Sequence, residues 1–149
     1  MKHFLILFLF FALTTYVACS VLPKKSPESY MQTAKDYFDK KDYPKAYKYY
    51  TRAIKLNPNL YQAYWERSSV EIKLDSSEKS IDDMGIYIES MRGKSNDADK
   101  KLLEKAFMQR ADIMFKKGYK SDACADWSDA CNLNISNYPC NLYRLNCKK

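Results

Sequence analysis

Histidine is almost absent from this sequence, because His3 is the single one among 149 residues. It lies in an N-terminal segment that has the order of an export signal, so the exported chain is expected to contain none. This absence removes the commonest general base, the commonest metal ligand and the usual partner of a nucleophilic serine. Glycine is also scarce, at three residues, and no glycine-rich phosphate loop occurs. We therefore expect neither an enzyme nor a bound cofactor.

Metal-binding and redox motifs are missing as well. Four cysteines follow Cys19 with spacings of 7, 9 and 7 residues, whereas zinc ligands usually come in close pairs about two to four residues apart. No CxxC redox motif is present. Acids such as Asp82-Asp83 and Asp126 with Asp129 fall in helical segments, where carboxylates usually face solvent or cap helices. Neither a metal site nor a catalytic pair of carboxylates is expected.

The first twenty residues have the order of a secretory signal peptide. Lys2 precedes an apolar run, Phe4–Leu13, and small residues follow that run. The run is shorter than the roughly 20 apolar residues that a membrane-spanning helix needs. We predict that residues 1–18 are a cleaved signal peptide and that residues 19–27 form a tether. An uncleaved anchor is the alternative.

The end of this segment, Val17-Ala18-Cys19, resembles the lipobox of bacterial lipoproteins, in which the cysteine becomes the lipidated first residue. Tyr16 stands where that pattern prefers leucine. We predict a lipid at Cys19, which would anchor the exported protein to a membrane in the periplasm or on the outer surface. Cleavage after Ser20, with Ala18 and Ser20 as the small pair, is the alternative.

The remaining chain, residues 28–149, has the length of one domain. The net charge of +7 becomes +6 once Lys2 leaves with the signal peptide, and such an excess favours anionic partners. The lysines are nevertheless scattered along the helices, without an arginine-rich block or a nucleic-acid-binding motif. We expect a solubilising surface and no specific nucleic acid.

Four positions recur three times along the chain with inner spacings of 12, 16 and 19 residues. The first set is Ala34, Ala46, Tyr50 and Ala53; the second, 34 residues later, is Ser68, Ser80, Met84 and Tyr87; the third, after a nine-residue insertion, is Ala111, Ala123, Trp127 and Ala130. This period indicates stacked antiparallel helix pairs. Because each pair leaves an apolar face uncovered, the pairs must stack. The sequence predicts an all-α fold, an α-solenoid of three helix pairs with a C-terminal capping helix.

Local signals agree with the repeat. Asp42 and Pro44 suit a helix start, and Gly93 suits a helix end. Because Ser95-Asn96 supplies an N-cap, we expect the insertion to lengthen the fifth helix. The expected helices cover residues 28–40, 44–56, 61–74, 77–92, 97–117, 120–132 and 138–147, the last being the capping helix.

Residues 27–60 closely resemble a tetratricopeptide repeat (TPR), and two looser matches follow. The first match rests on Tyr30, Ala34, Tyr37, Asp42-Tyr43, Ala46, Tyr50, Ala53-Ile54 and Pro58-Asn59. The second, within residues 61–94, rests on Ala63-Tyr64-Trp65, Ser68, Ser80-Ile81 and Met84. The third, within residues 104–132, rests on Ala106-Phe107, Arg110-Ala111, Gly118, Ala123, Trp127 and Ala130. Tyr87 departs from the small residue of the family. The resemblance implies three TPR-like repeats, but repeats of this kind serve unrelated partners.

An exported protein with an even number of remaining cysteines favours disulfides. The pairs Cys131–Cys140 and Cys124–Cys147 are both symmetric about the expected turn at residues 132–137. Residues equidistant from the turn of an antiparallel hairpin lie opposite one another, and a spacing of seven keeps both cysteines of a helix on one face. We predict these two nested disulfides, with buried free thiols as the alternative.

The TPR resemblance implies that the first helix of each pair lines a concave ligand-binding face. The corresponding residues are Met31, Lys35, Phe38, Trp65, Ser69, Ile72, Lys73, Met108, Asp112, Phe115 and Lys116. Phe38, Ile72 and Phe115 fit the core equally well. Tyr64 takes the packing position, so Trp65 is expected to be exposed in the groove.

These features predict a non-enzymatic protein- or peptide-binding scaffold of the cell envelope. Lys35 and Lys73 supply charge, but Glu66 replaces the asparagine with which some family members grip a terminal carboxylate. One alternative is a structural lipoprotein that self-associates as a homo-oligomer. Another is a basic surface that binds an anionic polymer or membrane. In a eukaryotic source, Asn134-Ile135-Ser136 would be a glycosylation acceptor.

Overall fold

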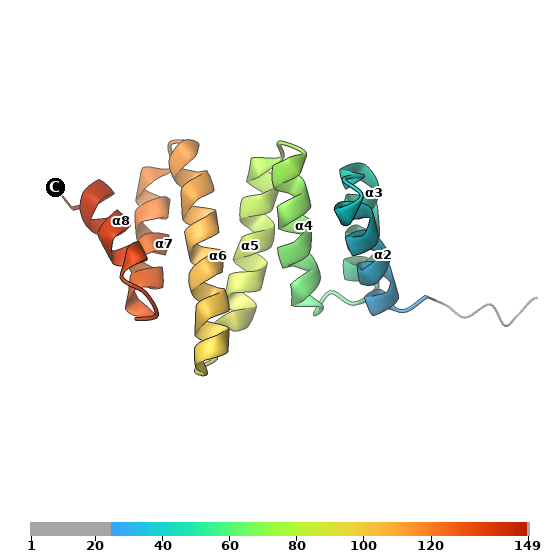
Figure 1. Ribbon diagram of the computed structural model, residues 1–149, viewed down its shortest axis with the longest axis horizontal. Helices are drawn as coiled ribbons and strands as arrows, with labels where there is room; N and C mark the ends of the chain where they lie inside the picture. The colour runs from blue at the N-terminus through green and yellow to red at the C-terminus, as the bar shows by residue number, and fades with distance from the viewer. Residues whose placement is uncertain (1–24, 149) are drawn as a thin grey trace, which may run out of the picture.

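The computed structural model describes residues 25–148, and every regular element in this part of the chain is an α-helix. The helices are α2 (Pro27–Asp39), α3 (Tyr43–Leu56), α4 (Tyr61–Lys73), α5 (Ser77–Met91), α6 (Asp97–Lys116), α7 (Lys120–Asn132) and α8 (Tyr138–Asn146). They stand side by side in chain order, with α2 and α3 at one end of an elongated molecule and α8 at the other (Figure 1). The predicted all-α stack is confirmed, and each expected boundary lies within one residue of the observed one. The predicted signal peptide, Cys19 and most of the predicted tether lie outside the described residues.

Side chains that precede the helices fix where several of them begin. The hydroxyl of Ser26 accepts a hydrogen bond from the Ser29 N–H at 3.2 Å and caps α2. The amide oxygen of Asn96 accepts one from the Asp99 N–H at 2.8 Å and caps α6. With this cap, α6, which is the fifth of the predicted helices, reaches 20 residues. The insertion therefore lengthens this helix, as predicted.

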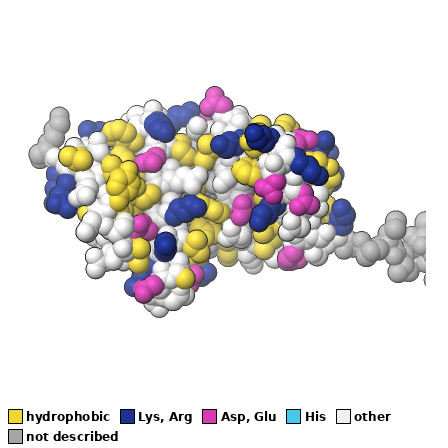
Figure 2. All heavy atoms as spheres, in the orientation of Figure 1, with side chains coloured by type: hydrophobic (Ala, Val, Ile, Leu, Met, Phe, Trp, Pro, Cys, Tyr) yellow, Lys and Arg dark blue, Asp and Glu magenta, His cyan; other side chains and the backbone are white. Residues whose placement is uncertain are grey.

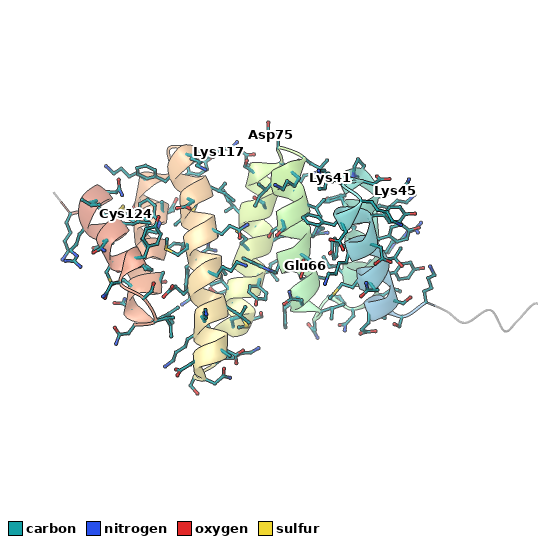
Figure 3. The ribbon with its side chains drawn as sticks, in the orientation of Figure 1. Lys41, Lys45, Glu66, Asp75, Lys117 and Cys124 are labelled. Atoms are coloured by element: carbon teal, nitrogen blue, oxygen red, sulfur yellow. A yellow bond between two sulfur atoms is a disulfide. The ribbon has the colours of Figure 1, made fainter. Side chains whose placement is uncertain are left out.

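The turn inside each helix pair has one shared backbone conformation. Lys41, Asp75 and Gly118 occupy the same repeat position, and their φ angles are 61°, 56° and 89°. In each turn the next N–H group bonds the carbonyl five residues before it, at 2.8–2.9 Å, which is the pattern of a Schellman C-cap. Figure 3 labels Lys41, Asp75 and Lys117, which lie along one edge of the molecule. All three pairs therefore turn at the same edge.

The core follows the repeat. Ala34 and Ala46 are fully buried where α2 and α3 cross, because only small side chains permit that approach. Tyr50 and Met84 fill the space beside the crossings and are also buried. Tyr87, the large residue in the second repeat, is 5% exposed and joins the central core cluster. The second repeat therefore buries a large side chain in the core at the position where the other two repeats have alanine.

Two disulfides hold α8 against α7. The Cα atoms of Cys124 and Cys147 lie 5.8 Å apart, and those of Cys131 and Cys140 lie 4.8 Å apart. These are the two nested pairs that the symmetry about the turn predicts. Tyr143 of α8 packs on the last core cluster, so the helix closes the C-terminal end of the stack. Among residues 25–148 no helix has both the length and the apolar character required to cross a membrane.

Candidate functional site

The first helices of the three pairs, α2, α4 and α6, carry the residues predicted to bind a ligand. The first three members on each helix are spaced four and three positions apart, and on α4 and α6 a lysine follows directly, so each set lies on one side of its helix. The exposed members are Lys35, Lys73, Asp112, Phe115 and Lys116, and the half-buried members are Met31, Phe38, Trp65, Ser69, Ile72 and Met108. We call this set of eleven residues the A-helix face. It combines a half-buried, mostly apolar floor with an exposed rim that is charged apart from Phe115.

Trp65 lies in the floor of the A-helix face, which corrects the expectation of an exposed side chain. Its ring is half-buried and packs at 5.3 Å, centroid to centroid, against Tyr87 of α5. The ammonium group of Lys105 on α6 stands 5.8 Å from the centroid of the Trp65 ring. The tryptophan therefore links α4 to the next helix pair, and part of its surface remains exposed.

Three other apolar members, Phe38, Phe115 and Met108, also pack against side chains of other helices. The Phe38 ring meets Tyr43 at 5.6 Å, and the Phe115 ring meets Trp127 at 5.1 Å. Met108 packs on the same central cluster as Trp65, so these two members from neighbouring repeats share one support. The floor of the A-helix face is consequently part of the packed structure, which keeps its shape fixed in the absence of ligand.

Sequence reasoning missed a pair of buried ion pairs. The guanidinium of Arg67 donates two hydrogen bonds to Asp83, at 2.7 and 2.8 Å, and Arg110 donates two to Asp126, both at 2.7 Å. Both aspartates are 4% exposed, so the expectation that these acids face solvent is wrong. Burial opposes the charge of Arg67 most strongly, but the hydrogen bonds that Arg67 donates to Asp83, together with the attraction of the Asp83 and Glu71 charges, outweigh burial and hold the Arg67 pKa above its ordinary value.

The two arginines also reach the preceding repeat. Arg67 donates a further hydrogen bond to Thr51 of α3 at 3.2 Å. The position equivalent to Thr51 in the next repeat is Gly85, and a Cβ there would lie 3.2 Å from Arg110 Nη1. Each guanidinium thus connects its own helix pair with the pair before it. A signal was present in the sequence, since arginine and aspartate recur 16 residues apart at the same repeat positions.

Glu71 lies beside the first of these ion pairs without a hydrogen-bond partner for Oε2 among the described residues. Glu71 is 2% exposed. Burial, together with the nearby charge of Asp83, raises the pKa of Glu71 to about 7. This carboxyl group therefore changes charge near neutral pH inside the interface between the first two repeats.

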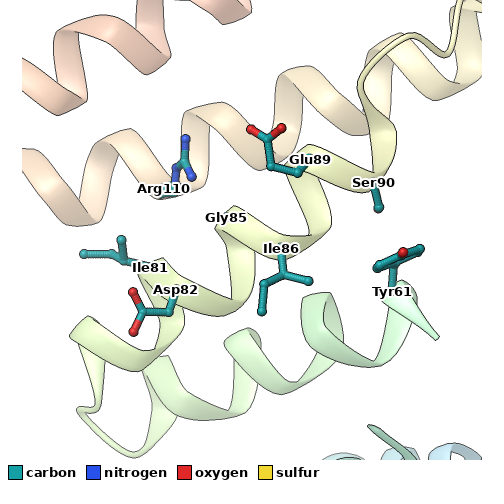
Figure 4. A pocket seen from close by; sticks show the side chains of 8 residues that line it. All are labelled: Tyr61, Ile81, Asp82, Gly85, Ile86, Glu89, Ser90 and Arg110. Carbon is teal, nitrogen blue, oxygen red and sulfur yellow. The ribbon is translucent and has the colours of Figure 1, made fainter. Parts of the chain in front are cut away.

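A cavity of about 660 Å³ opens along α5, and none of the A-helix face residues lines it. Its walls are Tyr61, Ile81, Asp82, Gly85, Ile86, Glu89, Ser90 and Arg110 (Figure 4). Two of its charged groups are already engaged, since Arg110 binds Asp126 and Glu89 binds Arg92 at 2.7 Å, whereas Asp82 is exposed on α5. Over residues 25–148 no group of His, Cys, Asp and Glu side chains is arranged to hold a metal ion.

The comparisons with known proteins agree with this arrangement. A family model described as tetratricopeptide repeat matches residues 27–60, the segment that contains α2 and α3. Residues 27–60 are therefore a tetratricopeptide repeat. The helix pairs formed by α4 with α5 and by α6 with α7 extend the same TPR stack beyond the matched segment.

Solved TPR domains share the fold of most of the chain. The N-terminal domain of stress-induced protein-1 (STI-1) from C. elegans has a TM-score of 0.70 and 18% identity, covering 80% of this chain and 92% of that one. The first TPR of Spaghetti (RPAP3), bound to the HSP90 peptide SRMEEVD, has a TM-score of 0.63 and 18% identity, covering 80% and 89%. The TPR2B domain of yeast Sti1, in a pHsp70 complex, has a TM-score of 0.61 and 25% identity, covering 78% and 92%. A comparison with curated protein sequences finds no match.

Proposed function

We propose that this TPR protein is a non-enzymatic scaffold of the cell envelope that binds a protein or peptide segment along its A-helix face. The observation that carries the proposal is the packed apolar floor around Trp65, bordered by exposed lysines on three successive first helices. A preformed floor lowers the ordering cost of binding. One of the similar TPR domains is bound to an HSP90 peptide, and another is in a complex with pHsp70. This supports a protein or peptide as the ligand class.

The charge of the A-helix face favours an acidic segment. Lys35, Lys73 and Lys116 are exposed on the rim, and Asp112 is the single acid among the eleven residues. Lys105 adds a further ammonium group above the Trp65 ring. Complementary charge speeds encounter and selects against basic partners. The ligand we favour therefore carries carboxylates beside one or two apolar side chains.

The envelope setting rests on the N-terminal sequence. The apolar run Phe4–Leu13 followed by Val17-Ala18-Cys19 supports export and lipidation at Cys19. The intact mass of the exported chain checks this: we expect a lipidated chain that begins at Cys19, and a Cys19→Ser variant that is released from membranes. A wild-type protein that begins at Val21 without lipid would contradict the lipid anchor.

Charge reversal tests the binding face without disturbing the core. The variant Lys35→Glu/Lys73→Glu/Lys116→Glu changes exposed groups on the A-helix face. Its matched control, Lys48→Glu/Lys55→Glu/Lys120→Glu, makes the same change in net charge on the second helices α3 and α7. The ligands are acidic peptides that are first selected from a displayed peptide library for binding to the wild-type chain. Calorimetric titration then measures their affinity for each variant. We expect the first variant to lose roughly tenfold or more in affinity and the control to lose little.

A structural role through self-association is the second candidate, because a repeat face also fits another copy of the chain. Sedimentation of the exported protein over a wide concentration range separates the two functions. A monomer that binds selected peptides agrees with the scaffold. A concentration-dependent oligomer that the A-helix charge reversal disrupts, with no peptide binding, would favour the structural role.

A further inference from the structure

The first repeat leaves open a surface that the later repeats bury against their predecessors. In the second repeat this surface carries Arg67, which reaches Thr51 of α3 and stands 5.7 Å from the ring centroid of Tyr47, also on α3. In the third repeat it carries Arg110, which packs against Gly85 of α5. Within residues 25–148 no helix pair precedes α2 and α3. The corresponding surface of the first repeat therefore lies at the free end of the stack (Figure 1).

At this free end, two tyrosines occupy positions where the second repeat carries buried charged groups. Tyr37 stands where the second repeat has Glu71, and Tyr49 stands where it has Asp83. The rings of Tyr37 and Tyr49 stack at 5.3 Å with 6° between their planes, and Tyr30 adds to the stack at 6.2 Å from Tyr49. All three tyrosines are half-buried. The end of the solenoid is therefore a ladder of partly accessible aromatic rings.

Four exposed cations lie over this ladder. The ammonium groups of Lys40 and Lys45 stand 6.0 and 5.1 Å from the Tyr37 ring centroid, and Arg52 stands 5.5 Å from that of Tyr49. The further cation is Lys25, 5.9 Å from the Tyr30 ring centroid. One acid is in direct contact with the group, since Asp42 binds Lys45 at 2.7 Å. On the side of the molecule seen in Figure 2, lysine and arginine side chains gather at this end, among some acids.

We propose that this open end, made of Tyr30, Tyr37, Tyr49, Lys25, Lys40, Lys45 and Arg52, docks on an anionic membrane surface. Phospholipid headgroups supply negative charge to the four cations, and tyrosine rings flanked by lysine stems suit the boundary between headgroups and acyl chains. The docking is independent of the A-helix face, which stays free for a protein ligand.

The position of the open end along the chain favours a membrane over a soluble acidic ligand. The chain leaves α2 toward its N-terminus at Lys25, which is six positions after Cys19. Six extended residues span roughly 20 Å at most, so a lipid at Cys19 would hold the open end close to the headgroups. An anchor and a basic surface together give more stable membrane attachment than either alone.

Charge argues against a second copy of the chain as the occupant. Two open ends placed face to face would bring the same cations together. The opposite end of the stack offers no complementary charge on its helix, because Arg144 is the single charged residue in α8. Neither a two-fold nor a head-to-tail contact through this surface is therefore favoured.

Vesicle flotation of the exported chain tests the proposal. The variant Lys25→Gln/Lys40→Gln/Lys45→Gln/Arg52→Gln removes the cations of the open end. The matched control Lys94→Gln/Lys100→Gln/Lys101→Gln/Lys120→Gln removes the same net charge elsewhere. Binding is compared between phosphatidylcholine vesicles and vesicles that contain phosphatidylglycerol, so attachment through any N-terminal lipid cancels in the ratio. We expect the preference of the wild type for anionic vesicles to fall by roughly tenfold or more in the first variant and to change little in the control.

Each other outcome overturns membrane docking at this end. An equal fall in both variants would mean that net charge alone attracts the chain, and an unchanged ratio in both would mean that the open end is covered. Binding of soluble polyglutamate that depends on the four cations, with no preference for anionic vesicles, would assign the surface to an acidic polymer. The variant Lys25→Arg/Lys40→Arg/Lys45→Arg keeps the charge and should bind as the wild type does, provided that circular dichroism shows equal helix content in all chains.

Discussion

Arg67 holds a buried carboxylate, and its loss should be far more damaging than the loss of an exposed arginine. Removing one partner leaves an uncompensated buried charge on Asp83, which typically costs about 3–5 kcal/mol. We expect Arg67→Met to lower the free energy of unfolding in urea by that order. The double variant Arg67→Met/Asp83→Leu should recover part of the loss, while Arg92→Met, at an exposed pair, should leave the unfolding midpoint nearly unchanged. Equal effects of Arg67→Met and Arg92→Met would contradict a structural role for the buried pair.

Glu71 should make the stability of the wild-type chain depend on pH. Burial raises its pKa from 4.5 to about 7 in the folded state, so the folded chain holds a proton that the unfolded chain has released. The associated stability is complete below about pH 4.5 and is lost as the pH rises through about 7. Relative to Glu71→Gln, the wild type should lose roughly 1–3 kcal/mol between pH 5 and pH 8. Urea unfolding of both chains at several pH values checks this, and parallel profiles would show that the carboxyl group is not responsible.

The side chains that sequence reasoning misplaced are those whose surroundings come from a neighbouring element. Trp65 was expected to be exposed from its own helix, but Tyr87 and Lys105 lie against its ring from α5 and α6. From the sequence, Asp83 and Asp126 were expected to face solvent. In the structure, an arginine of the same helix pair binds each of them. Helix periodicity predicts which residues share a side of a helix, but not what covers that side.

At the scale of the helix and the turn, the three left-handed positions give a matched experiment. Lys41 and Asp75 carry a Cβ in a backbone conformation that glycine adopts without strain, as Gly118 does at the same repeat position. Lys41→Gly and Asp75→Gly should each stabilise the fold by about 0.5–1 kcal/mol, because relief of strain exceeds the added freedom of the unfolded chain. Gly118→Ala should destabilise it by a similar amount. Thermal unfolding measures all three, and a lower Tm for both glycine variants would refute the shared conformation.

The helix α8 should depend on its disulfides. Its nine residues are too few to form a stable helix alone, and it packs on α7 at the end of the stack. Non-reducing peptide mapping should find Cys124 joined to Cys147 and Cys131 joined to Cys140. Replacing the outer pair, which closes a separation of 23 residues, by serine should cost about 3 kcal/mol by the loop-entropy model. Four free thiols, or Cys124 joined to Cys131, would contradict this arrangement of the cap.

The helices themselves were predictable because several local signals agree. Small residues at a fixed period indicate the crossings, and capping residues such as Asn96 indicate where a helix begins. The cysteine pairing followed from symmetry about a single turn, which is a local relation. In contrast, the buried ion pairs depend on contacts between the two helices of a pair, and the cavity along α5 depends on contacts between repeats. No periodicity within one helix predicts either feature.

The whole molecule presents two surfaces with different chemistry. The A-helix face has an apolar floor with a lysine rim, and the open end has tyrosines under cations. The TPR stack could be predicted from the sequence, because its characteristic residues recur at fixed spacings along the chain. The identity of a ligand could not, since side chains on a TPR surface vary without changing the fold. The central claim is therefore about the place of binding: a protein ligand meets the A-helix face.

Site-specific photo-crosslinking in the cells that produce the protein tests this claim most directly. A photoreactive residue at Ser69, in the floor of the A-helix face, is compared with the same residue at Asp82, which is exposed on α5. We predict that Ser69 gives an adduct with a defined partner protein, that the charge-reversed Lys35→Glu/Lys73→Glu/Lys116→Glu chain loses it, and that Asp82 gives none. An adduct from Asp82 with none from Ser69, or an adduct at Ser69 that survives charge reversal unchanged, would contradict binding through the A-helix face.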